Sequence, residues 1–118
     1  MKCMPDVLRY ILLETEKHDV FGFDARELAN DEYDGDILTN HAILLANAGY
    51  LNCTRSDTFS KRVIFIDGIT MRGYTFLDSI RDNRVWLQVI KELAKNIAPV
   101  ALSSIEEIAK KIKQNPKN

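Results

Sequence analysis

The sequence predicts a mainly α-helical fold with a small β-hairpin: a winged helix-turn-helix followed by two additional amphipathic helices at the C-terminal end. Three observations predict it. The stretch 34–51, DGDILTNHAILLANAGYL, has apolar residues at helical spacing and ends in a glycine followed by an extended run. Two β-branched or aromatic runs follow, separated by a polar loop. Two later segments repeat the i, i+3, i+4, i+7 apolar pattern. We expect three helices before residue 50, a two-stranded wing near 51–67, and helices at about 70–82, 84–97 and 103–114.

Length and composition predict one soluble domain. The chain has 118 residues, of which 46% are hydrophobic and 28% charged. We assign 1–82 to the winged-helix core, 83–114 to a helical extension of the same domain, and 115–118 to a loose tail. No apolar run approaches the roughly 18 residues that cross a membrane, and the first residues lack the apolar centre of a signal peptide. A cytoplasmic location without a membrane partner is therefore expected.

The first helix is predicted from Asp6 to Lys17, with Pro5 near its start, where a missing N–H costs little. Phe21-Gly22-Phe23 indicates a turn with two aromatic anchors, and Asp24 should cap a short helix after it. The acidic segment 30–36, NDEYDGD, resembles a calcium loop only superficially, because His41 stands where the bidentate Glu should follow the glycine. No metal site is expected there.

The central helix should bury a stripe of apolar residues, and Gly49 should end it in a left-handed conformation. The strands of the hairpin are predicted at 51–55 and 62–67, on either side of SDTFSK. Thr70 is the expected N-cap of the next helix, where Gly73 would allow a close approach of a neighbouring segment. The predicted members of the central stripe are Ile37, Leu38, Ala42, Leu44, Leu45 and Ala48.

The two C-terminal helices are strongly amphipathic. The first is expected at about 84–96, and a capping box of Ser103 and Glu106 should open the second. A core of three helices and a wing does not need both apolar stripes, so they should either close a homodimer or fold back on the chain's own core. The candidate dimer residues are Trp86, Ile90, Leu93, Ile97, Ile105, Ile108 and Ile112.

No motif for catalysis or for cofactor binding is found, and we expect a protein that is not an enzyme. Cys3 and Cys53 have no metal or disulfide spacing and are expected to be free thiols. His18 and His41 are the only imidazoles, and neither lies near a cysteine in sequence. Since His41 falls on the apolar stripe, a structural histidine bonded to the backbone or to a carboxylate is favoured over a ligand or a base.

Charge is unevenly distributed along the chain. Residues 1–50 contain four Lys or Arg and ten Asp or Glu, whereas residues 51–118 contain twelve and seven. A nucleic-acid reader usually gathers basic residues around its reading helix, but here that helix lies in the acidic half. Asp34 and Asp36 at its entrance would face the DNA backbone.

Two functions remain open. In the first, a DNA-binding regulator contacts double-stranded DNA with the outer face of the central helix, through Thr39, Asn40, Ile43 and Asn47, and with wing cations that meet phosphates. In the second, the protein is a non-enzymatic interaction module that docks a second copy of itself or a host or phage protein. The wing cations are Arg55, Lys61 and Arg62.

Three sequence blocks carry a family resemblance: PDVLRYILLETE, NHAILLANAGYL and GITMRGYTFLDSIRDNRVW, followed by the ending SIEEIAKK. Together they resemble a family of small uncharacterised bacterial and prophage proteins classed as a domain of unknown function. The resemblance implies a winged-helix fold and a phage or prophage setting, and no activity. Family members often place a basic residue after the histidine of the central helix, where this chain has Ala42-Ile43.

Overall fold

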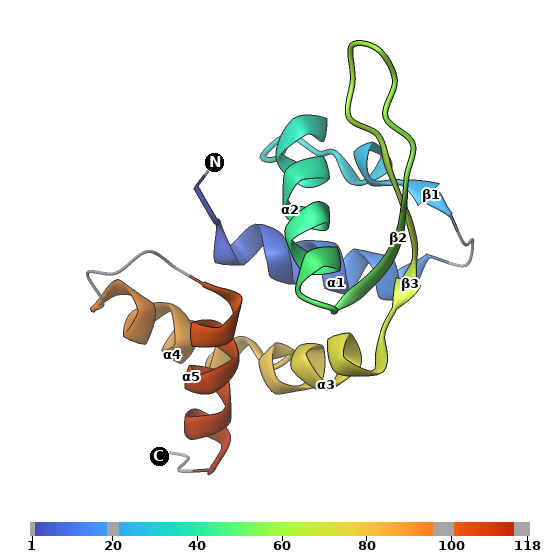
Figure 1. Cartoon of the computed structure of the whole chain (residues 1–118). Helices are drawn as coiled ribbons and strands as arrows, with labels where there is room; N and C mark the ends of the chain where they lie inside the picture. Colours follow the sequence, from blue (N-terminus) through green and yellow to red (C-terminus); the bar gives the residue numbers. More distant parts are fainter. Residues whose placement is uncertain (1, 19–21, 96–100, 115–118) are drawn as a thin grey trace.

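The computed structural model describes residues 2–18, 22–95 and 101–114. These residues are mostly helical, with a small antiparallel sheet on one side of the molecule (Figure 1), as the sequence predicted. None of the helices within these ranges is long and apolar enough to span a lipid bilayer. In chain order the elements are α1 (Pro5–Lys17), β1 (Phe23–Asp24), the 3-10 helix η1 (Ala25–Leu28), α2 (Gly35–Asn47), β2 (Leu51–Arg55), β3 (Ile64–Ile69), α3 (Met71–Ile80), α4 (Asn83–Ala94) and α5 (Leu102–Gln114).

The sheet has three strands in the order β1-β3-β2, one more than the two-stranded wing expected from the sequence. In the added strand Phe23 pairs with Ile66 and Asp24 pairs with Phe65. A strand of two residues is too short to show alternation, and only its pairing with a distant segment makes it extended. The expected cap follows directly, since the Asp24 carboxylate accepts from the backbone N–H of Arg26 and opens η1. Phe21 of the predicted turn lies outside the described residues.

The hairpin is offset from its predicted position. β3 begins at Ile64 and extends to Ile69, two residues later at each end than expected. Its pairing with β2 shifts register between Asn52 and Cys53, where the ladder contains a bulge. The ends of a strand depend on the hydrogen bonds it makes with its neighbouring strand rather than on local β propensity. The apolar run therefore predicted that a strand is present but not the residues at which it begins and ends.

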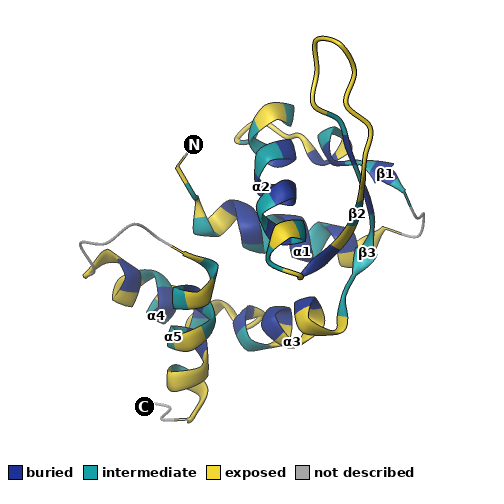
Figure 2. Cartoon of the chain, in the orientation of Figure 1, coloured by how far each residue is buried: buried dark blue, intermediate teal, exposed yellow. Residues whose placement is uncertain are grey.

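Helix starts and turns with local signals lie where the sequence placed them. The Asp34 carboxylate accepts from the backbone N–H of Ile37 at 2.9 Å and caps α2. After α2 the chain turns at Gly49, whose φ is +86°. The Thr70 hydroxyl accepts from the N–H of Gly73 at 2.9 Å and caps α3. Figure 2 shows the buried faces of α1, α2 and α3 turned toward the core.

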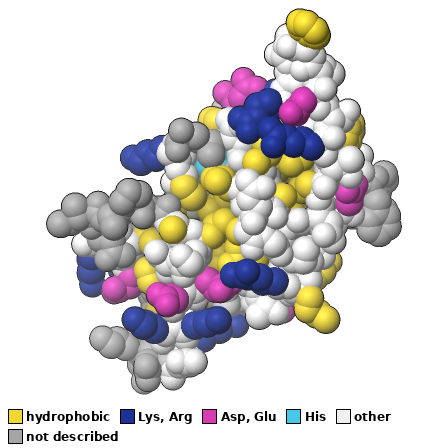
Figure 3. Space-filling view, viewed as in Figure 1, with side chains coloured by type: hydrophobic (Ala, Val, Ile, Leu, Met, Phe, Trp, Pro, Cys, Tyr) yellow, Lys and Arg dark blue, Asp and Glu magenta, His cyan; other side chains and the backbone are white. Residues whose placement is uncertain are grey.

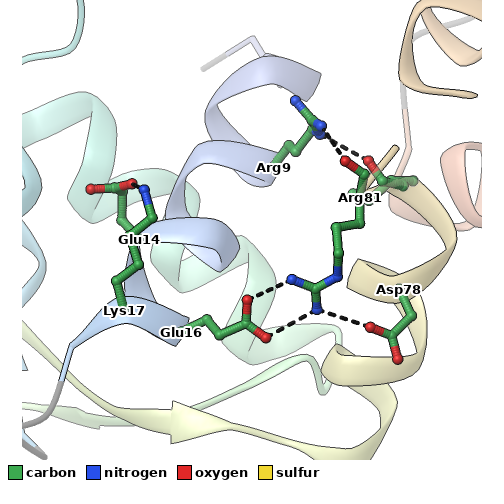
Figure 4. Close-up of polar contacts among 7 residues, drawn as sticks. Arg9, Glu14, Glu16, Lys17, Asp78 and Arg81 are labelled. Carbon is green, nitrogen blue, oxygen red and sulfur yellow. Dashed lines mark hydrogen bonds and ion pairs between the residues drawn. The ribbon is translucent and has the colours of Figure 1, made fainter. Parts of the chain in front are cut away.

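Helix α1 holds the end of α3 through a set of polar contacts (Figure 4). The Arg9 guanidinium donates to the backbone carbonyls of Ile80 and Arg81 at 2.9 and 2.8 Å. The last carbonyls of a helix lack partners inside it, so Arg9 satisfies two of them. Arg81 in turn donates two hydrogen bonds to Glu16, at 2.6 and 3.0 Å, and one to Asp78 at 2.9 Å. The α3–α4 corner is therefore fastened to α1 from both sides.

The C-terminal helices fold back on the chain's own core. The Trp86 side chain on α4 is 6% exposed, and its indole N–H donates to Asp6 on α1 at 2.8 Å. Ile105 on α5 is fully buried, and the Tyr50 hydroxyl donates to the Glu106 carboxylate at 2.6 Å. Burial, and next the hydrogen bond to Glu106, raise the pKa of Tyr50 to about 12, so this hydroxyl stays protonated at neutral pH.

Both helix starts in this region differ slightly from prediction. Asp82, which was not predicted as a helix cap, caps α4 by accepting from the backbone N–H groups of Arg84 and Val85. α5 begins at Leu102, so Ser103 lies inside the helix and does not form the expected capping box with Glu106. The carbonyl of Ala101 instead accepts the first hydrogen bonds of that helix, from residues 104 and 105. Both errors are of one or two residues, the usual uncertainty of helix ends.

Of the residues predicted for a dimer interface, Trp86, Leu93 and Ile105 are buried within the single chain. Ile90, Ile108 and Ile112 are half-buried and pack against the same core. Ile97 lies outside the described residues. While α4 and α5 keep this arrangement, the three buried side chains are not available to a second copy.

Candidate nucleic-acid interface

The hairpin of β2 and β3 projects beyond the N-terminal end of α2 (Figure 1). Its two arms stay paired past the ladder, because the N–H of Ser56 donates to the carbonyl of Val63 at 3.0 Å. Nearer the tip, the N–H of Thr58 donates to the carbonyl of Lys61 at 2.9 Å. Residues 59–60 form the turn itself. The loop is therefore a narrow, hydrogen-bonded ribbon rather than an open coil.

The three predicted wing cations all lie on this ribbon and are all exposed. Arg55 forms an ion pair with Asp57 at 3.3 Å. Arg62 donates to the Asn40 side-chain oxygen on α2 at 3.1 Å. Among the described residues, the Lys61 ammonium has no hydrogen-bond or ion-pair partner. Figure 3 shows Lys and Arg side chains gathered at the base of the projecting loop, with acidic groups beside them.

The tip of the hairpin carries Phe59, which is 110% exposed. The sequence analysis treated SDTFSK as turn chemistry and did not single this residue out. A signal was nevertheless present, since a large aromatic side chain stands alone among small polar ones in that loop.

Two of the four α2 residues predicted to face a partner are buried, which corrects their assignment. Thr39 is 2% and Ile43 is 8% exposed. The expected outer face assumed that α2 packs on one side only, but it contacts α1, η1 and both long strands, so its buried arc is wider than the stripe. The Thr39 hydroxyl is also occupied, because it donates to the carbonyl of Gly35 at 2.8 Å. Asn47 is exposed and Asn40 is half-buried.

The acidic residues at the start of α2 are compensated within the fold. Asp34 accepts a backbone hydrogen bond as the helix cap, where the helix dipole favours its charge. Asp36 forms an ion pair with Arg26 of η1 at 2.6 Å. The expected repulsion of a phosphate backbone by these two carboxylates is therefore smaller than the sequence alone indicated.

His41 lies on the buried side of α2, with 1% of its surface exposed. Its Nδ1 contacts the carbonyl of Ile37 at 2.8 Å, and its Nε2 accepts from the backbone N–H of Met4 at 2.9 Å. These two contacts require a neutral ring with its proton on Nδ1. Burial lowers the pKa of His41, while the carbonyl of Ile37 opposes that shift. The geometry is that of the structural histidine that the sequence favoured.

His41 makes the stability of the fold dependent on pH. Its pKa in the folded chain lies below the unfolded value of 6.5, so its contribution is fully present above pH 6.5 and is lost as pH falls through the folded pKa. We expect the urea midpoint of the wild type to decrease between pH 7.5 and 5, and His41→Gln, which cannot titrate, to show a smaller decrease. The exposed His18 is common to both proteins. Equal decreases would contradict this assignment.

Both cysteines are half-buried free thiols whose pKa values are raised. Burial, together with the nearby Asp67 carboxylate, raises the pKa of Cys53 to about 11, and burial also raises the pKa of Cys3. Nucleophilic and metal-binding cysteines instead have lowered pKa values. Within the described ranges, no group of three His, Cys, Asp or Glu side chains is placed to hold a metal ion. The α2–hairpin face consists of the cations Arg55, Lys61 and Arg62, the amide side chains Asn40 and Asn47, and the ring of Phe59.

Comparison with known proteins places the chain in a family whose function is not known. No curated protein and no solved structure matches it. One family model matches residues 2–99, which contain α1 to α4 and the whole α2–hairpin face, and its range ends before α5. The sequence blocks PDVLRYILLETE, NHAILLANAGYL and GITMRGYTFLDSIRDNRVW fall within that range, whereas SIEEIAKK falls beyond it. The chain therefore belongs to the family described as hypothetical protein (DUF2513).

Proposed function

We propose that the protein is a DNA-binding module of the winged helix-turn-helix type, which contacts double-stranded DNA with α2 and the β2–β3 hairpin. The order of elements supports this proposal. A short helix, η1, precedes α2, and a hairpin follows it, as expected where a reading helix is flanked by a supporting helix and a wing. The sequence resemblance adds a bacterial or prophage setting, in which the module would serve a transcriptional regulator.

The hydrogen bond from Arg62 to Asn40 carries the proposal. It joins the hairpin to α2, so cations suited to phosphates and an amide suited to base edges form one continuous surface. The Asn40 oxygen accepts from Arg62, which leaves the amide N–H groups of Asn40 free to donate to an acceptor on a base. Arg62 thereby also orients Asn40, and the two residues are expected to act together.

Because Thr39 and Ile43 are buried, we expect the hairpin to contribute more of the binding free energy than α2. With these two inside the core, base contacts from α2 fall to Asn40 and Asn47. Phosphate contacts supply most non-specific affinity in protein–DNA complexes. We therefore expect binding in which the hairpin dominates and sequence preference is modest.

Charge reversal at Lys61 tests the proposal. We chose this residue because it has no partner among the described residues, so Lys61→Glu should not disturb the fold. In a fluorescence anisotropy titration at low salt, the wild type should bind a mixed-sequence duplex, and Lys61→Glu should weaken binding to all sequences alike. Lys91→Glu on α4 changes the charge equally, far from the proposed face, and should bind almost like the wild type. Equal losses for the two variants would contradict the proposal.

Asn40→Ala separates base contact from phosphate contact. Loss of this single amide hydrogen bond should cost about 0.5–1.5 kcal/mol at a preferred site and leave binding to other sequences nearly unchanged. Preferred sites can be selected from a random duplex library with the wild type. A uniform loss across all sequences would show that Asn40 positions Arg62 rather than contacting bases.

A second candidate is a non-enzymatic protein interaction module, favoured by exposed apolar side chains on the opposite part of the molecule. Met71 and Tyr74, one turn apart on α3, are 86% and 43% exposed, and Leu87 on α4 is 61% exposed. A docking surface on this part of the molecule would use these apolar side chains. If the wild type does not bind mixed-sequence duplex DNA at low salt, the interaction module becomes the proposed function in place of DNA binding.

A further inference from the structure

Phe59 is the most exposed large hydrophobic side chain among the described residues. Its exposed fraction, 110%, means that the ring contacts almost nothing in the folded chain. An aromatic ring left in water contributes no burial free energy to folding. The ring is therefore available for a contact outside the chain.

The residues around the ring indicate which kind of partner it would contact. Its immediate neighbours along the chain are Thr58 and Ser60, and Lys61 and Arg62 follow on the same arm. On the other arm, Arg55 is offset by Asp57. Figure 3 shows the result: hydrophobic atoms at the tip of the projecting loop and basic side chains at its base. The hairpin therefore has an apolar side chain at its tip and basic side chains directly behind it.

This pattern fits DNA better than a protein surface. A ring that anchors a protein interface is normally surrounded by further contacts that exclude water from it. Around Phe59 the tip is narrow and polar, and no second apolar side chain lies beside it in the sequence of the turn. A base-pair step needs no such surrounding surface, because it encloses an inserted ring between two flat faces while phosphates on either side meet the cations.

We propose that Phe59 is a wedge that inserts between adjacent base pairs of duplex DNA and bends it. This inference rests on the proposed function and names the mode of contact. Apolar side chains that enter a base step from the minor groove partly unstack it and kink the duplex. Lys61 and Arg62 would hold the phosphates beside the opened step, and the paired arms of the hairpin would keep the ring from folding away.

A wedge implies a preference for DNA that opens easily. Pyrimidine–purine steps such as TA are the most readily kinked, and a mismatched pair costs less to unstack than a matched one. The protein should therefore bind a duplex with a central TA step or mismatch more tightly than a uniform GC duplex of the same length. This preference would arise without any hydrogen bond to a base edge.

Substitution of the ring tests the wedge. Phe59→Ala should bind a duplex with a central mismatch about 5- to 150-fold more weakly than the wild type, the range for loss of one aromatic–base stack. To detect unstacking, 2-aminopurine is placed at the mismatch, and its fluorescence should rise with the wild type and not with Phe59→Ala. To detect bending, energy transfer is measured between dyes on the two ends of the duplex, and it should change with the wild type only. Met71→Ala removes a similarly exposed apolar side chain elsewhere and should match the wild type. Because the ring contacts nothing, Phe59→Ala should melt at the wild-type temperature.

Three other results would overturn the inference, each in a different way. If Phe59→Ala binds and bends DNA as the wild type does while Lys61→Glu weakens binding, the ring is no wedge and the proposed function stands. If the wild type binds neither the mismatched nor the matched duplex at low salt, the proposed function fails, and the wedge fails with it. If the wild type self-associates without DNA and Phe59→Ala does not, the ring docks on protein.

Discussion

Gly73→Ala is expected to destabilise the fold by about 3 kcal/mol or more, at the upper end of the cost of overpacking a core. A Cβ atom at this position would lie 2.1 Å from the backbone oxygen of Tyr50 and 2.7 Å from Cγ2 of Ile69. The first contact is with backbone, which cannot rotate away. Tyr50 is also held in place, because its carbonyl accepts from the N–H of Thr70 at 3.2 Å. The substitution must therefore displace α3 from the sheet.

Urea unfolding of purified protein measures this effect. Thr75→Ala, an exposed position on the same helix, serves as the control and should change stability by no more than about 0.5 kcal/mol. A Gly73→Ala protein whose stability is within about 1 kcal/mol of the wild type would show that α3 does not pack this closely on the backbone of Tyr50.

Trp86→Ala is expected to cost about 3–5 kcal/mol, the range for truncating a large aromatic side chain in a core. The ring is buried, its N–H donates to Asp6, and the Arg9 guanidinium lies 5.5 Å from its centroid. Trp86→Phe keeps most of the packing and loses the hydrogen bond to the carboxylate, so it should cost about 1–3 kcal/mol. Leu87→Ala, next along α4 but 61% exposed, should have little effect.

The same experiment separates a fold-back core from a dimer interface. If Trp86 is buried within one chain, the unfolding midpoint of the wild type should be the same at about 1 and 100 μM protein, since no association contributes to stability. A midpoint that rises with concentration, and a Trp86→Ala protein that has lost this rise, would instead place the α4 stripe between two copies.

The parts of the fold that sequence predicted well are those specified by neighbouring residues. The Thr70 cap and the Gly49 turn each depend on interactions within a few positions along the chain. The apolar stripes of α4 and α5 likewise located both helices to within two residues at their starts. Such features appear in a sequence because their physical cause is local.

The parts that sequence did not predict depend on distant partners. β1 is extended because β3 lies beside it, and nothing in Phe23-Asp24 alone requires a strand. Ile43 was assigned to the outside of α2 because one apolar stripe seemed sufficient, whereas the sheet and α1 together bury a wider arc. The bulge between Asn52 and Cys53 likewise depends on tertiary pairing.

For the candidate site, sequence supplied the cations but not their arrangement. Arg55, Lys61 and Arg62 were recognisable as wing charges from their positions beside a polar turn. The hydrogen bond from Arg62 to Asn40 joins residues of two separate elements and required the structure. The exposure of Phe59 also required the structure, because an aromatic residue in a loop can equally well pack into the core.

The salt dependence of DNA binding tests the central claim most directly. For three phosphate contacts from Arg55, Lys61 and Arg62, the slope of log K against log salt should be about −3 for a mixed-sequence duplex, measured by anisotropy from about 20 to 200 mM salt. A triple variant with Glu at these positions should have a slope near zero at greatly reduced affinity. A wild type that does not bind at the lowest salt, or a triple variant that keeps the wild-type slope, would contradict DNA binding by the α2–hairpin face.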